Sequence, residues 1–169
     1  MPFVVLSAIV LWAHIFGAIG WLGAAMVFGM VIGPSLLKLS PPARGEFFVK
    51  VVPNFARYIE IFSILTVVFG VAMVAVLADG NTSIMSLSTS FGLYISIGAV
   101  LSLVAIGIAL GVILPTTHKM VKIAESMMKS PGPPPPELAV AAKRLRVSST
   151  IGMVLLIIVT MFMVAGATL

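Results

Sequence analysis

Two ionisable side chains stand inside long apolar stretches of this sequence, and they are the residues best suited to chemistry. They are His14, in the first stretch, and Glu60, near the start of the second. An ionisable group within a hydrocarbon layer is costly and usually serves an ion, a proton or a cofactor. Both are therefore candidate functional residues, and each also has a purely structural alternative.

His14 is the first candidate because an imidazole can bind haem iron, another metal ion or a quinone. Gly17 and Trp21 follow it on the same face of a helix, so they are candidate contacts of a cofactor bound there. The structural alternative for His14 is a hydrogen bond to a backbone carbonyl or a serine on a neighbouring helix. The sequence leaves both interpretations open.

The depth of His14 limits which residue could share an iron with it. His118 lies just past the far end of its own apolar stretch, about 30 Å from His14 in depth at 1.5 Å per residue. One haem cannot bridge that separation, so His118 is predicted to be a surface residue. Met73 is the methionine nearest in depth and the predicted second ligand, with water or no ligand as alternatives. Met161 and Met163 also lie toward this side of the membrane.

Glu60 stands about two helical turns into the second apolar stretch, with Arg57 three residues before it. Side chains at this spacing share a helix face, so the two could form an ion pair near the interface. Alternatively, Glu60 accepts a proton or a cation on a path from the cytoplasm. A lone acid can drive proton-coupled transport, provided that no arginine neutralises it.

Other chemistry has little support in the sequence. Met26 and Met30 share a helix face and could bind copper, because thioethers prefer Cu(I), although methionine also packs well between helices. Cysteine is absent, which excludes thiolate metal sites, cysteine nucleophiles and covalent c-type haem. No Ser-His-Asp array, phosphate-binding loop or His-Glu-x-x-His motif is present.

The elements that must position these residues are four apolar helices. The chain has 169 residues, of which 60% are hydrophobic and 9% charged, against about 25% charged in soluble proteins. A membrane-spanning helix needs about 20 apolar residues. We predict an all-α integral-membrane four-helix bundle in a single domain, residues 1–169. The predicted spans are residues 3–33, 55–78, 91–114 and 147–168.

All ten lysine and arginine residues fall in two clusters, between residues 38 and 57 and between residues 119 and 146. Cytoplasmic loops carry the excess of Lys and Arg. The sequence therefore predicts both termini outside and basic cytoplasmic loops at 34–54 and 115–146, in a multi-pass protein of the cell's inner (cytoplasmic) membrane. The net charge of +5 is then loop charge that meets anionic lipid, and nucleic acid is not an expected partner.

Both basic loops are predicted to contain short amphipathic helices. Residues 116–129 form a basic amphipathic segment expected on the cytoplasmic surface. The proline-rich residues 131–136 are expected to be a stiff hinge, or a site for a proline-binding partner. From Pro136 one helix is expected to continue into the fourth span.

Small residues recur at helical spacing along the predicted spans. They are Ala13, Gly17, Gly20 and Ala24, then Gly29 and Gly33, and Gly107 and Gly111. Such stripes let helices approach closely in lipid. They indicate a tight bundle, a contact in a homo-oligomer or a larger membrane complex, or room for a flat cofactor.

The stretch from His14 to Ala25 (HIFGAIGWLGAA) resembles the first helix of the CopD-like superfamily. That group includes copper-resistance D domains, HemJ-type protoporphyrinogen oxidases and uncharacterised four-span families. Residues 31–39 and 52–58 are similar to one of the uncharacterised families. The resemblance covers roughly residues 10–70. It implies a four-helix bundle with His14 facing the interior, as a haem b ligand or in copper handling. Gly33-Pro34-Ser35 replaces the Leu-Pro-Arg-like segment of HemJ-type proteins, so that oxidation is not expected.

Taken together, these features favour a b-type haem-binding protein of electron transport, or a subunit of a redox complex, with His14 as axial ligand. Two alternatives remain open. One is a cofactor-free structural or accessory subunit of a larger membrane complex. The other is a small copper or proton-coupled transporter. The sequence does not decide whether the protein is an enzyme.

Overall fold

The computed structural model describes residues 2–78, 82–130 and 132–168, and every element in these ranges is helical. In chain order, the elements are α1 (Pro2–Val27), η1 (Phe28–Ile32), α2 (Gly33–Leu36), α3 (Pro41–Lys50), α4 (Val52–Ala78), η2 (Thr82–Met85), α5 (Ser90–Ile108), η3 (Ala109–Ile113), α6 (Leu114–Lys129) and α7 (Pro136–Thr168). Four continuous stretches are long and apolar enough to cross a membrane: Val5–Leu36, Val52–Ala78, Ser90–Lys129 and Pro136–Thr168. The predicted all-α membrane bundle is therefore confirmed.

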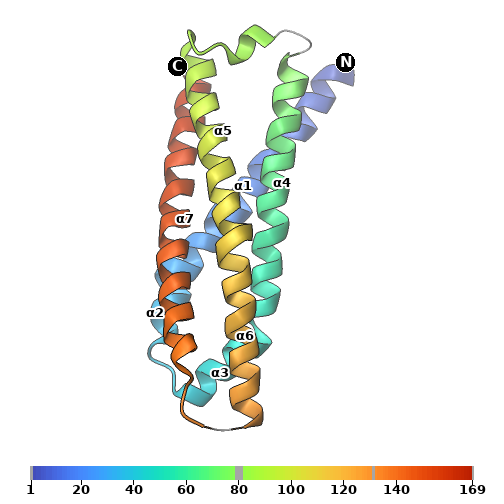
Figure 1. The fold of residues 1–169 in the computed structure, drawn as a ribbon. Coiled ribbons are helices and arrows are strands. Elements are labelled where there is room, and N and C mark those ends of the chain that lie inside the picture. Colours follow the sequence, from blue (N-terminus) through green and yellow to red (C-terminus); the bar gives the residue numbers. More distant parts are fainter. Residues whose placement is uncertain (1, 79–81, 131, 169) are drawn as a thin grey trace.

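The bundle consists of two antiparallel helix pairs. α1 packs chiefly against α4, and α5 packs chiefly against α7, with fewer contacts between the pairs. Both termini lie at one end of the bundle and both basic connections lie at the other (Figure 1). We call these the terminal end and the basic end. This arrangement agrees with two loops on one side of the membrane, and the charge rule predicts that this side faces the cytoplasm.

Glycines set the closest approach within each pair. A Cβ on Gly17 of α1 would lie 2.8 Å from Oγ1 and 2.9 Å from the backbone nitrogen of Thr66 on α4. In the second pair, a Cβ on Gly98 of α5 would lie 2.9 Å from the terminal methyl of Met163 on α7. Small residues thus bring helices together in each pair, as expected where packing replaces the hydrophobic effect.

The first helix of each pair is interrupted in the same way. The π-helical turn η1 ends immediately before Gly33-Pro34, and the π-helical turn η3 ends immediately before Leu114-Pro115. Proline has no backbone N–H and its ring crowds the preceding turn, so the hydrogen-bond ladder must widen locally. The two halves of the chain therefore share a helix–π-turn–helix followed by an antiparallel partner helix.

The basic end has its own hydrophobic core. Met120 of α6 and Ala141 and Leu145 of α7 are buried together, with Phe48 of α3 packed against them. The predicted amphipathic segment is therefore helical and continuous with α5 through η3, and its apolar face is covered by α3 and α7. The helix from Ser90 to Lys129 has 40 residues, or about 60 Å, so the basic end extends beyond a hydrocarbon core of about 30 Å.

Candidate functional site

His14 lies at the tight crossing of α1 and α4. Its ring nitrogen Nδ1 lies 2.8 Å from the backbone carbonyl oxygen of Thr66. Because a carbonyl only accepts, Nδ1 must carry the proton and donate it. A Cβ on Gly70 would lie 2.9 Å from Cε1 of this ring, so a glycine at that position leaves room for the imidazole. This is the structural role that the sequence left open, a hydrogen bond to a carbonyl of the neighbouring helix.

The residues predicted to surround a cofactor at His14 do not converge on one cavity. Gly17 faces the backbone of Thr66, so its small size serves helix contact. Met73 lines a hollow with Val10 and Leu11, one helical turn from His14 toward the terminal end. Trp21 lines a different pocket, and neither lining includes His14.

The other predicted ligands lie apart from both sites. Met26 and Met30 are exposed on the outside of the bundle. His118 is exposed on α6, as expected for a surface residue. Within residues 2–78, 82–130 and 132–168, no three His, Cys, Asp or Glu side chains are close enough to hold a metal ion.

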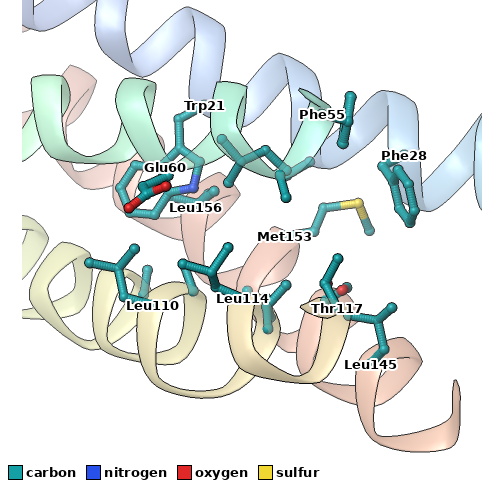
Figure 2. Close-up of a pocket in the computed structure, with 18 of the residues that line it drawn as sticks. Trp21, Phe28, Phe55, Glu60, Leu110, Leu114, Thr117, Leu145, Met153 and Leu156 are labelled. Carbon is teal, nitrogen blue, oxygen red and sulfur yellow. The ribbon is translucent and has the colours of Figure 1, made fainter. Parts of the chain in front are cut away.

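The pocket lined by Trp21 lies between the two helix pairs, in the half of the bundle nearer the basic end, and we call it the inter-pair pocket. Its enclosed space is about 80 Å³, and one side of it is open. Figure 2 shows side chains from α1, α4, η3, α6 and α7 converging on it. Its wall is mostly apolar and includes Trp21, Phe28, Phe55, Leu114, Met153 and Leu156. The π-helical turns η1 and η3 both contribute lining residues.

Two buried clusters close this pocket at its ends. Trp21, only 3% exposed, forms a cluster with Ala105, Ala109 and Leu156 and closes the side toward the terminal end. The cluster around Leu145 closes the side toward the basic end. Leu110 on η3 is the exposed member of the lining, which places the open side of the pocket beside this π-helical turn.

Among the described residues that line this pocket, Glu60 is the one with an ionisable side chain. It is partly buried, and its carboxylate makes no ion pair or hydrogen bond to any residue that the structure describes. Arg57, three residues earlier on α4, is exposed and does not pair with it. The interfacial Arg57–Glu60 ion pair is therefore absent from the described part of the chain. Figure 2 shows the Glu60 carboxylate and the indole of Trp21 at the same end of the pocket.

Two hydroxyl groups complete the polar part of the lining. Thr117 of α6 and Ser149 of α7 both border the pocket. Neither hydroxyl forms a hydrogen bond within the described ranges. Sequence reasoning identified Glu60 but missed these two residues and the pocket itself. The available signal was the pair of proline-interrupted spans in corresponding positions of the two halves, a pattern typical of binding sites in membrane carriers.

We compared the chain with protein-family models, curated proteins and solved structures, and none of them matches. The resemblance of residues 14–25 to the CopD-like superfamily therefore stays a prediction. What the protein does must be argued from the two sites just described.

Proposed function

We propose that this protein is a small membrane transporter whose solute pocket lies between its two helix pairs, with Glu60 as the proton-accepting group. The observation that carries this proposal is the unpaired Glu60 carboxylate in a pocket within the membrane bundle. Keeping a carboxylate there without a partner is costly, so a function that needs its charge is the simplest reason for its presence.

The arrangement of the two halves supports the same proposal. Many transporters consist of two structural repeats, with the substrate bound at the interface between them by helices that are interrupted there. In this chain the pocket lies between the α1/α4 and α5/α7 pairs, and both interrupted helices reach it through η1 and η3. The limited contact between the pairs leaves them free to rock against each other.

Alternating access can be tested without knowing the solute. The sequence contains no cysteine, so a single cysteine at Ser149→Cys would report on the pocket alone. We expect a membrane-impermeant maleimide to label this residue both in right-side-out and in inverted vesicles. Labelling from one side only, or from neither, would contradict transport and favour a structural subunit.

Two control variants calibrate this measurement. Lys122→Cys, exposed at the basic end, should react only in inverted vesicles, which also tests the predicted orientation. Val104→Cys, exposed on the outer face of α5, should react in neither preparation because it faces lipid. Together, these two controls distinguish labelling through real access to the pocket from labelling caused by leaky vesicles.

A second candidate function is haem b binding at His14. The hydrogen bond from Nδ1 to Thr66 leaves Nε2 as the free nitrogen, which is how metal-ligating histidines are oriented. His14 would hold the iron through Nε2, and Met73, in the neighbouring hollow, is the candidate second ligand. The resemblance to CopD-like proteins supports this candidate. Bound haem would supply one-electron transfer.

A visible spectrum tests this candidate. Purified protein that binds haem b should show sharp α and β bands in the reduced-minus-oxidised difference spectrum, and His14→Ala should remove them. A flat spectrum from folded protein incubated with hemin would retire this candidate and leave the transport proposal untouched, because His14 does not line the inter-pair pocket.

A further inference from the structure

We infer that the inter-pair pocket binds a monovalent organic cation with a bulky aromatic or apolar body. This inference rests on the proposed transport function and names its class of substrate. Three properties of the pocket support it: the sign of its charge, the nature of its wall and its open side.

The charge of the pocket favours a single positive charge on the ligand. Within the described lining, Glu60 is the only charged residue, and Thr117 and Ser149 add two neutral hydroxyls. On the helix of Glu60, the nearby ionisable groups are Arg57 and Tyr58, and both are exposed. α1, η3, α6 and α7 contribute no ionisable side chain to the lining. An anion would be repelled here, and a neutral ligand would leave the carboxylate unpaired.

An inorganic cation fits this lining poorly. Ca²⁺ takes about six to eight oxygen ligands, and Mg²⁺ needs near-octahedral oxygen coordination. The described lining offers only one carboxylate and two hydroxyls as polar side chains. A soft metal ion would need sulfur or imidazole ligands, and Met153 is the only such side chain in the wall. The cation therefore has to be one whose charge needs few ligands.

The wall of the pocket supplies what an organic cation needs. Trp21, Phe28 and Phe55 border it, and aromatic faces attract cations while also packing against apolar rings. The rings of Phe28 and Phe55 stack on each other with centroids 5.1 Å apart. Phe55 in turn stacks on Tyr58, with ring centroids 6.5 Å apart, so contacts with neighbouring rings hold the aromatic side chains of this wall in place. The rings of a ligand can pack against such a surface.

The open side of the pocket gives a bulky ligand room that the enclosed part does not. The enclosed space is only about 80 Å³, and the pocket opens beside the exposed Leu110 on η3, so the body of the ligand can extend through this side. Met153 adds a flexible thioether to the wall, which lets one pocket adapt to several ligand shapes.

Glu60 also couples the ligand to protons. The carboxylate can hold one proton or neutralise one monovalent cation, and a cation that binds to the protonated form displaces that proton to the solvent. Repeated at both sides of the membrane, this exchange moves one cation against one proton and needs no other reactant. Binding should accordingly weaken as the pH falls.

Binding of tetraphenylphosphonium to the purified full-length protein tests the inference directly. In a Trp12→Phe background the only remaining tryptophan is Trp21, whose fluorescence reports on the pocket. We expect tetraphenylphosphonium to quench it saturably, and Glu60→Gln to weaken binding by about tenfold or more, because contacts to a charged partner contribute more than neutral ones. Tetraphenylborate, which has the same shape and the opposite charge, should not bind.

Matched variants distinguish the loss of the Glu60 charge from a general effect on folding. Glu60→Asp keeps the charge and should retain binding. Glu46→Gln removes an exposed acid that pairs with Lys50 at 2.9 Å outside the pocket, and should change nothing. Equal binding of both tetraphenyl ions, or unchanged binding in Glu60→Gln, would overturn the inference and indicate a site for lipid chains.

The result of the binding experiment can be distinguished from the result of the transport test. If Ser149→Cys is labelled from both sides and tetraphenylphosphonium does not bind, transport stands and the substrate class is wrong. If tetraphenylphosphonium binds and the label enters from one side only, the protein is a cation-binding subunit that does not transport.

Discussion

His14 and Glu60 are both ionisable residues within membrane-spanning helices, yet their surroundings differ in every respect. His14 lies where a glycine lets α1 and α4 approach closely, and its Nδ1–H donates a hydrogen bond to the Thr66 carbonyl oxygen, 2.8 Å away. Glu60 lies where the two helix pairs separate, and no described residue pairs with it. The histidine is part of the packing, and the glutamate is available to a ligand.

Neighbouring residues, more than residue type, decide which intramembrane group is available for chemistry. By type alone, His14 ranks first because imidazole is the more versatile ligand. The donor of its ring is already satisfied, however, whereas all four lone pairs of the Glu60 carboxylate lack a partner among the described residues. Mutations that loosen the crossing or change the pocket can therefore test the contrast.

Trp21 separates the two regions, and its removal should have the largest effect. It is 3% exposed in the cluster that closes the pocket toward the terminal end. Truncating a buried aromatic residue typically costs about 3–5 kcal/mol, so Trp21→Ala should lower the free energy of unfolding by about that amount. Denaturant titration in mixed micelles measures it.

The matched control is Trp12→Ala, because Trp12 is 65% exposed on the same helix and faces lipid. Trp12→Ala should lower the free energy of unfolding by much less than Trp21→Ala. Equal losses in the two variants would show that the buried cluster does not hold the helix pairs together.

Substitutions at the tight crossing of α1 and α4 should have the next largest effect on stability. In Gly17→Val the new Cβ would lie 2.8–3.1 Å from Thr66 atoms, including its backbone, which cannot move aside without separating the helices. Overpacking of this kind costs about 1–3 kcal/mol. Gly107→Ala is the control, since nothing lies within 4 Å of a Cβ there. A similar thermal midpoint for both variants would contradict the close approach.

A third experiment compares the two ionisable residues directly. His14→Leu loses the hydrogen bond to Thr66 and should destabilise the protein by about 0.5–1.5 kcal/mol. Glu60→Leu removes a carboxylate without a partner and should leave stability unchanged or raise it, while abolishing cation binding. If the two variants lost equal stability, the proposed division between a structural and a functional residue would be wrong.

The sequence was enough to predict the bundle, because hydrophobic length and the placement of lysine and arginine act locally and strongly. It also singled out Glu60 and offered the carbonyl hydrogen bond as one role for His14. It could not predict that Arg57 would turn away from Glu60, since helical spacing permits the pair without requiring it. Nor could it place Thr117 and Ser149 in the lining of the same pocket as Glu60, because that arrangement depends on how the two helix pairs dock. The helix continues past Pro115 because the chain forms a π-helical turn just before it.

The smallest expected effect concerns an acid outside the pocket. Glu137 of α7 pairs with Lys119 of α6 at 2.8 Å, and this hydrogen bond and the charge of Lys119 hold the pKa of Glu137 below its ordinary value of 4.5. A lowered pKa stabilises the fold above the ordinary value, and this contribution is lost as the pH falls through the lowered one. Glu137→Gln should therefore melt slightly below the wild-type protein at neutral pH and together with it in strong acid.

Because the Glu137–Lys119 pair is exposed, salt should shrink the difference in melting temperature. Tetraphenylphosphonium binding should not change in Glu137→Gln, since this carboxylate does not line the pocket. A loss of cation binding in this variant would mean that the ion pair between α6 and α7 helps to shape the basic end of the pocket. In that case Glu60 would not act alone, and the contrast with His14 would have to include the packing of both helix pairs.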